Sequence, residues 1–162
     1  SAKIHNMKIE TIVEPNEHIS AIAQRYVEIV AATLPGRHIE MVGAMAVPMV
    51  GRPELDILII TDDVEGDAAT LETVGFGHRG SGDDALYLKP MVEGIEVTVQ
   101  IMRPDNALIP ILRGTVKLLR DDHELRNRYE AFKKTLSGLP RDEYKKKKVA
   151  WMTENVLPRI GR

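Results

Sequence analysis

The chain has 162 residues, of which 43% are apolar and 28% are charged, a composition typical of a soluble globular domain. Its net charge of −2 gives the whole molecule no strong attraction for nucleic acid or for an anionic membrane, so we expect neither as a partner. The lack of cysteine excludes a disulfide framework and a thiolate metal site, and it is compatible with the cytoplasmic location that we expect. No apolar run approaches the ~20 residues that cross a bilayer.

The first half of the chain predicts strands mixed with helices. After a strand over Met7 to Val13, Asn16 is a helix N-cap and Pro35-Gly36 ends that helix. The apolar run inside Glu54 to Thr61 indicates a strand covered on both faces. The other predicted elements are a strand at His38 to Val42, a turn with one helical turn at Gly43 to Pro53, a helix at Glu65 to Val74, a flexible glycine-rich loop at Gly75 to Gly82, and a hairpin of strands at Ala85 to Lys89 and Gly94 to Met102.

The second half of the chain predicts only helices. Apolar residues recur at helical spacing from Leu108 to Leu119 and from Leu125 to Leu136, and a third helix runs from Arg141 to Val156. Strands with helices first and a helical tail last imply an α+β fold. We expect one domain over residues 7–160, with residues 1–6 an added remnant or a disordered terminus.

Acidic residues mark the strongest strand and the strand at Gly94 to Met102. Glu54 and Asp56 share one strand face, and Glu96, Thr98 and Gln100 alternate in the same way. If the strands pair, three carboxylates could converge and hold Mg²⁺ for phosphoryl or nucleotidyl transfer. The alternative is that these acids are ordinary solvated side chains at strand ends.

The segment GAMAVPMVGRPELDI resembles the signature of the GrpB-like proteins, H-I-G-S-T-A-V-P-G-L-x-x-K-P-x-x-D-I. The direct matches are Gly43, Ala46-Val47-Pro48, Pro53 and Asp56-Ile57, and Arg52 stands at the lysine of the signature. That family is described as predicted nucleotidyltransferases. The resemblance therefore implies a nucleotidyltransferase-like mixed β-sheet with an N-terminal helix and a C-terminal helical tail.

The resemblance extends along the chain. It includes the family's stretches G-Y-x-x-R-G, P-E-L-x-x-x-Y-x-x-x-K and Y-x-x-x-K-x-x-[FW], in order. The matching residues are Gly75-Phe76, Arg79-Gly80, Leu86 to Lys89, Glu124-Leu125, Tyr129, Lys133, Tyr144, Lys148 and Trp151. Agreement in this order is more specific than any single motif.

Departures from the family pattern fall on the presumed site. Met41 replaces the histidine, Ala44 the serine and Met45 the threonine of the signature, while Thr98 and Gln100 stand at the two histidines of an H-x-H strand. These are groups that would bind phosphate or metal. Their joint loss indicates either a lost activity or a changed ligand.

Basic residues near the turn are candidates for binding phosphate oxygens, as the bidentate guanidinium does well. The predicted substrate-binding residues are Gly43, Ala44, Arg52, Arg79, Lys89, Thr98 and Gln100. The expected ligand is a nucleotide or a small phosphorylated molecule. We interpret the basic run Lys145 to Lys148 as a solvated helix face.

Three functional hypotheses follow. In the first, Glu54 and Asp56 hold Mg²⁺ and Glu96 holds a second ion or acts as a base, which makes these three the catalytic and metal residues of a nucleotidyltransferase. In the second, the chain is a non-catalytic binding or interaction module on the same fold. In the third, four methionines make the pocket apolar and suited to another small molecule. These methionines are Met41, Met45, Met49 and Met102.

Overall fold

The computed structural model describes residues 12–91 and 95–160, apart from the side chain of Arg79. The predicted strand at Met7 to Val13 and the expectation for residues 1–6 therefore fall mostly outside the described residues, although Val13 forms a β-bridge with Gly51. The elements are α2 (Glu17–Thr33), β1 (His38–Val42), η1 (Ala44–Ala46), β2 (Glu54–Ile60), α3 (Val64–Glu72), β3 (Phe76–Gly82), β4 (Ala85–Pro90), β5 (Glu96–Met102), α4 (Leu108–Asp121), α5 (His123–Thr135), α6 (Arg141–Asn155) and η2 (Leu157–Arg159).

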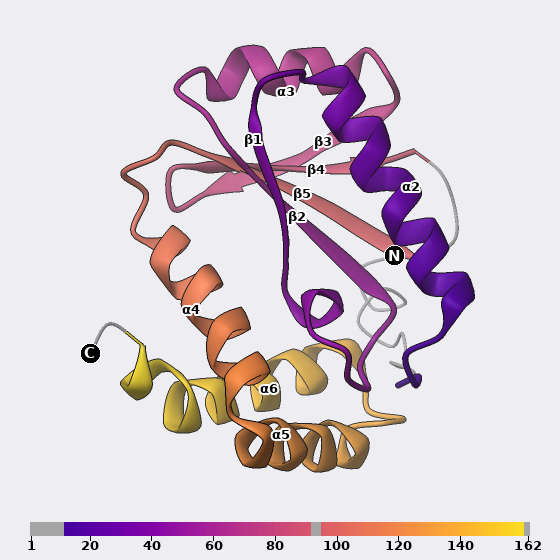
Figure 1. Ribbon diagram of the computed structural model, residues 1–162, viewed down its shortest axis with the longest axis vertical. Coiled ribbons are helices and arrows are strands. Elements are labelled where there is room, and N and C mark those ends of the chain that lie inside the picture. The colour runs from indigo at the N-terminus through magenta and orange to yellow at the C-terminus, as the bar shows by residue number, and fades with distance from the viewer. Residues whose placement is uncertain (1–11, 92–94, 161–162) are drawn as a thin grey trace.

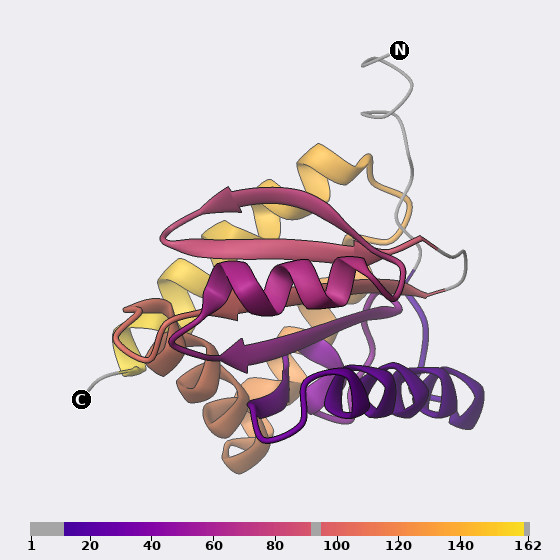
Figure 2. The same ribbon diagram turned by 90° about the horizontal axis from the view of Figure 1, so that it is seen from above.

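The strands form one mixed sheet in the order β1-β2-β5-β4-β3. β2 and β5 are parallel, and the other neighbouring pairs are antiparallel. Figures 1 and 2 show α2 beside the β1–β2 end of the sheet and the β3–β4 hairpin at the opposite edge. The predicted α+β class and the hairpin of β4 with β5 are confirmed.

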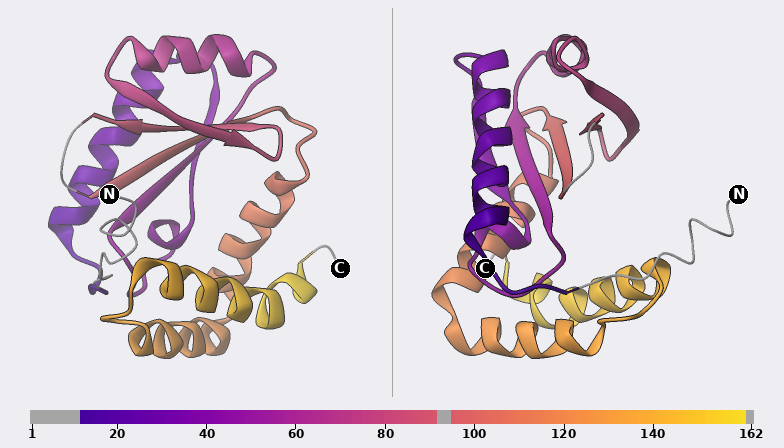
Figure 3. Two further views of the ribbon diagram at one scale, coloured as in Figure 1. Left: turned by 180° about the vertical axis from the view of Figure 1, so that it is seen from behind. Right: turned by 90° about the vertical axis from the view of Figure 1, so that its right-hand side faces the viewer.

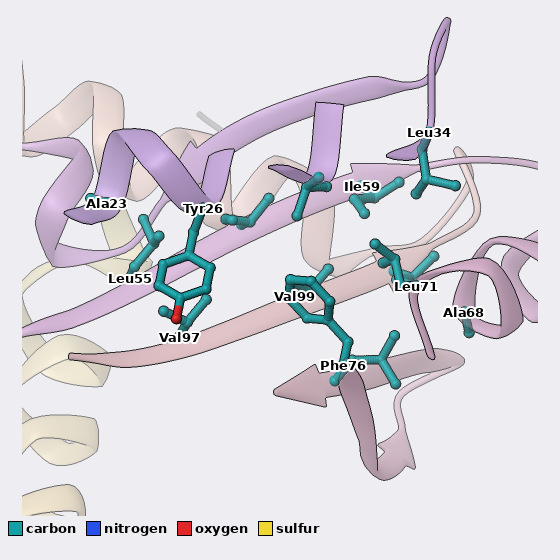
Figure 4. Packing of buried hydrophobic residues seen from close by; sticks show 14 residues of the cluster. Ala23, Tyr26, Leu34, Leu55, Ile59, Ala68, Leu71, Phe76, Val97 and Val99 are labelled. Carbon is teal, nitrogen blue, oxygen red and sulfur yellow. The ribbon is translucent and has the colours of Figure 1, made fainter. Parts of the chain in front are cut away.

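One face of the sheet packs against α2 and α3. Alternate residues of β2 and β5, such as Leu55, Ile59 and Val99, are buried on this face. Figure 4 shows Tyr26 of α2 and Leu71 of α3 pointing toward these strand side chains. Apolar residues on both faces of β2 explain why its run Ile57 to Ile60 is continuous.

The opposite face packs against the C-terminal helices. Leu58 and Met102 of the sheet share a buried cluster with Leu119 of α4, Tyr129 of α5 and Val156. Figure 3 shows α5 and α6 side by side beyond one end of the strands. This packing brings residues from the end of the sequence next to the turn between β1 and β2.

The start and end of α2 follow the predicted signals. The side chain of Asn16 accepts a hydrogen bond from the backbone N–H of Ile19 at 2.9 Å, as an N-cap does. The helix ends at Thr33, and Gly36 has φ of 81°. The predicted helices at Leu108 to Leu119, Leu125 to Leu136 and Arg141 to Val156 correspond to α4, α5 and α6.

The flexible loop predicted at Gly75 to Gly82 is wrong, because Phe76–Gly82 is strand β3. Glycines are weak strand formers, so propensity did not indicate it. Pairing with β4 supplies the backbone hydrogen bonds, and the buried ring of Phe76 anchors the strand. Asp83 and Asp84, with φ of 52° and 56°, make the two-residue turn that a tight hairpin needs.

Candidate functional site

The register between β2 and β5 places the acidic residues together. Glu54 is the partner of Glu96, and Asp56 is the partner of Thr98. Side chains at these positions point to the face that carries η1 and the C-terminal helices, since Leu55 and Val97 face the other way. Two of the three predicted carboxylates therefore lie opposite each other, with Asp56 two residues further along.

A guanidinium lies between the two opposed carboxylates. Arg52 donates from one nitrogen to Glu54 and from the other to Glu96, the latter at 3.1 Å. Its side chain is only 8% exposed, and its guanidinium also lies 5.4 Å from the ring centre of Tyr144. A cation of the chain thus takes the place between Glu54 and Glu96 that a bridging metal ion would need.

Two more cations bind the other oxygen of Glu96. Lys89 and Arg141 both donate to Oε1, the latter at 2.6 Å. Burial acts to raise the pKa of Glu96, but the hydrogen bonds from Lys89 and Arg141 outweigh it and hold the pKa at about 2. Glu96 is therefore an anion at neutral pH, and it joins β5 to β4 and α6.

Asp56 has a different environment. Burial, with the nearby negative charge of Glu54, raises the pKa of Asp56 to about 7, against the attraction of Lys148 and Arg52. A side-chain carbon on Gly43 would lie 2.4 Å from Oδ2 of Asp56, and Gly43 has φ of 72°. Both the backbone conformation of the turn and the space for the carboxyl group require glycine here.

Replacement of Gly43 by alanine is expected to destabilise the protein by about 2 kcal/mol, since it combines a strained positive φ with a collision against Asp56. Gly36 is a matched control, because its φ is 81° but an added carbon would meet nothing within 4 Å. Urea denaturation should give a clearly smaller loss for Gly36→Ala, near 1 kcal/mol. Equal losses of stability in the two variants would show that the collision with Asp56 contributes nothing to the destabilisation at Gly43.

Residues of α5 and α6 complete the pocket beneath the turn. It is lined by Gly43, Ala44, Arg52, Glu54, Asp56, Lys133, Tyr144 and Lys148. Its volume is about 40 Å³, room for only a few water molecules. Lys133, Tyr144 and Lys148 matched the resemblance but were not predicted as site residues, and Lys148 was assigned to a solvated helix face.

Lys133 is the most unusual of these residues. It is 1% exposed, and its amine has no hydrogen-bond partner among the described residues. Burial lowers the pKa of Lys133 to about 7, and the positive charge of Lys148 acts in the same direction. The amine lies 4.5 Å from the ring centre of Tyr129 and close to Gly51.

The remaining predicted residues differ in their position relative to this pocket. Ala44 lines the pocket. Thr98 is buried, and no described residue accepts from or donates to its hydroxyl. Gln100 lies further along β5, opposite Leu58. Arg79 belongs to β3, but its side chain is outside the described part of the structure.

The methionines do not make the carboxylate pocket apolar. Met45 and Met49 line a separate pocket of about 200 Å³ with Val13 and Pro15. Met102 is fully buried in the core, and Met41 borders a third cavity with Arg113. The expectation of an apolar, methionine-lined site at Asp56 is therefore wrong, because the methionines of the turn line another pocket and those of the strands lie in the core or at a third cavity.

The donor set does not fit a divalent cation as it is arranged. Mg²⁺ requires several free oxygen ligands in octahedral geometry. Here the carboxylates of Glu54 and Glu96 are bound by Arg52, Lys89 and Arg141. Within residues 12–91 and 95–160, no group of three or more His, Cys, Asp or Glu side chains has an arrangement that could hold a metal ion.

Among the described residues, no helix is both long enough and apolar enough to cross a bilayer.

The family model of the GrpB protein matches residues 10–156, which is most of the chain. This chain belongs to the GrpB family. A curated relative, a UPF0157 protein of Vibrio cholerae, is 27% identical over 157 residues that cover 94% of this chain and 82% of the relative. The family resemblance identified from the signature is confirmed.

Solved structures agree with this GrpB assignment. The crystal structure of the conserved protein GrpB from Enterococcus faecalis has a TM-score of 0.69 with 18% identity, and covers 88% of this chain and 98% of that one. A Cid1 poly(U) polymerase, in a mutant bound to MgATP, has a TM-score of 0.53 with 11% identity; the match covers 80% of this GrpB-family chain and 43% of the polymerase. Likeness at this identity shows that the fold is nucleotidyltransferase-like.

Proposed function

We propose that this GrpB-family chain is a binding module on a nucleotidyltransferase-like fold, which takes the phosphate of a small ligand such as a nucleotide without a metal ion and without transfer chemistry. The observation that carries the proposal is the position of Arg52 between Glu54 and Glu96. Metal-dependent transfer needs free carboxylates. In this chain the carboxylates of Glu54 and Glu96 are already neutralised by arginine and lysine side chains.

The charges of the pocket support an anionic ligand. Lys133, Lys148 and Arg52 line it, against Glu54 and Asp56. Lys133 has no carboxylate partner among the described residues, so an entering anion would supply its missing hydrogen-bond acceptor. The volume of about 40 Å³ suits the phosphate end of a ligand, while the rest of a nucleotide would lie outside the pocket.

Mg²⁺-dependent nucleotidyl transfer is the second candidate. It is favoured by the common strand face of Glu54, Asp56 and Glu96 and by the likeness of the fold to a polymerase. For this function Arg52 would have to leave the two carboxylates before a metal could bind them. The two candidates therefore differ in their metal requirement.

Thermal melting with ATP or GTP separates the candidates, since a ligand that binds only the native state raises the melting temperature. We expect the same rise in EDTA as in Mg²⁺, and no release of pyrophosphate. Lys148→Gln should reduce the rise, whereas Lys147→Gln, at an exposed position of the same helix, should not. The proposal would be contradicted if the nucleotides left the melting temperature unchanged both in EDTA and in Mg²⁺. Pyrophosphate release that requires Mg²⁺ and is abolished by Asp56→Asn would establish the second candidate instead.

A further inference from the structure

A buried lysine that has no hydrogen-bond partner in the described part of the chain needs an explanation beyond stability. Lys133 lies inside α5, and its amine is sealed from bulk water, with no hydrogen bond to any described residue. The carboxylate one helical turn away, Glu130, instead accepts a hydrogen bond from the backbone N–H of Val50 at 3.1 Å. Among the described residues, no carboxylate is hydrogen-bonded to Lys133, as one would be in a structural ion pair.

The surroundings of Lys133 favour the neutral form of its amine, which becomes well populated near pH 7. Loss of water and the positive charge of Lys148 bring the pKa of Lys133 to about 7, against a weaker opposing attraction from Glu130. The ring of Tyr129 favours the charged form, but it is a small effect beside burial. A neutral lysine amine has a free electron pair and is a nucleophile, whereas a protonated one is not.

We propose that Lys133 is a reactive amine that forms an imine with a small anionic carbonyl compound, such as a 2-oxo acid or a phosphorylated aldehyde. The pocket supplies what such a ligand needs. Lys148 lines the same space and would hold its acidic group. This inference needs an anionic ligand in the pocket but neither a nucleotide nor a metal, so it goes beyond the binding function proposed above.

The reaction is a condensation that balances without any oxidant or reductant. Nζ of Lys133 attacks the carbonyl carbon and gives up one of its two protons, while the carbonyl oxygen takes up a proton to give a carbinolamine. The hydroxyl group then leaves as water with a proton supplied by the carboxyl group of Asp56, which lines the pocket and whose pKa of about 7 lets it carry a proton near neutrality. The C=N bond forms as water leaves, and the nitrogen then gives up its remaining proton to the carboxylate of Asp56.

Glyoxylate is a probe of the right size and charge for this pocket. The folded protein would be treated briefly at pH 7 with glyoxylate and cyanoborohydride, which traps an imine as a stable secondary amine, and the modified lysines would be located by peptide mass spectrometry. We expect labelling of Lys133 at least tenfold above that of Lys134, the next residue of the helix, whose side chain is 59% exposed. Glycolaldehyde, an uncharged aldehyde of similar size, should label Lys133 less than glyoxylate does.

Two variants complete the test. Lys133→Met should lose the preferred label, and Lys134→Met should keep it, with circular dichroism showing that both are folded. Labelling of Lys133 no greater than that of Lys134 would overturn the inference, and so would labelling that appears only in unfolding concentrations of urea. Labelling of exposed lysines shows in either case that the reagent works. A nucleotide-induced melting shift without a label at Lys133 would leave the binding function standing and refute the imine.

Discussion

Replacement of Arg52 by glutamine is expected to lower the free energy of unfolding by about 3 kcal/mol. The guanidinium bridges Glu54 and Glu96, whose side chains are 19% and 18% exposed. Without it two mostly buried carboxylates face each other, and Glu54 loses its hydrogen-bonded partner. Glu96 keeps Lys89 and Arg141, so the loss should lie at the lower end of the range for breaking buried ion pairs. Urea denaturation at pH 7 measures it.

Arg113→Gln is the matched control for this change. Arg113 also pairs with a glutamate, Glu40, at 2.6 Å, but its side chain is 45% exposed, against 8% for Arg52. Solvent screening makes such a pair weak, so the expected loss is below about 1 kcal/mol. Equal losses in the two variants would mean that burial of the Arg52 bridge has no consequence.

Mg²⁺ gives a second readout on Arg52→Gln. Once the guanidinium is gone, the carboxylate of Glu54 and Oε2 of Glu96 become available to a hard cation. Millimolar Mg²⁺ is therefore expected to restore part of the stability of this variant and to leave the unaltered protein unchanged. If Mg²⁺ stabilised the unaltered protein equally, Arg52 would not be the competitor of the metal, and the proposal of a metal-free binding module would fail.

Replacement of Lys133 by methionine is expected to raise the free energy of unfolding by about 2 kcal/mol at pH 7, because it removes a buried amine without a described partner and keeps most of the side-chain volume. Lys134→Met changes an exposed residue of the same helix and should stay within about 0.5 kcal/mol of the unaltered protein. A clear loss of stability in Lys133→Met would show that the amine is satisfied in the folded state.

The pH dependence of stability gives the same lysine a second signature. The pKa of Lys133 is lowered from 10.5 to about 7 on folding. Between these values the unfolded chain binds a proton at this lysine that the folded chain does not, so stability rises with pH by up to about 1.4 kcal/mol per pH unit. Denaturation between pH 7 and 10 should show a smaller rise in Lys133→Met. Part of the rise remains, because burial also lowers the pKa of Lys148.

Asp56 acts in the opposite direction at lower pH. Its pKa is raised from 3.8 to about 7, so the folded protein binds the extra proton in that window and its contribution to stability falls as pH rises. The contribution of Asp56 to stability falls up to about pH 7, and the contribution of Lys133 rises above it. The two residues together therefore contribute least to the stability of the protein near pH 7. A ligand that supplies a hydrogen-bond acceptor to Lys133 would offset the cost of burying this amine.

The local structure was largely readable from the sequence, because its signals are local. Asn16 caps α2 and the apolar run before Thr61 makes β2, as predicted. Alternation along β2 also put Glu54 and Asp56 on one face before any partner strand was known. Strand β3 was missed, because a glycine-rich edge strand depends on its pairing with β4 rather than on its own residues.

The sequence by itself determined most of the elements, the family signature and the acidic face of β2. Only the tertiary structure decided which residues the acidic side chains of β2 contact. The register of β2 and β5 set Glu54 opposite Glu96, and the packing of α5 and α6 beneath the turn brought Lys133 and Lys148 to Asp56. The spacing of Lys133 and Lys148 in the sequence does not predict that they contact Asp56. Their burial, and with it their loss of water, depends on how the helices pack in the assembled core. The protonation states of Asp56 and Lys133 therefore follow from the tertiary packing and cannot be read from the sequence.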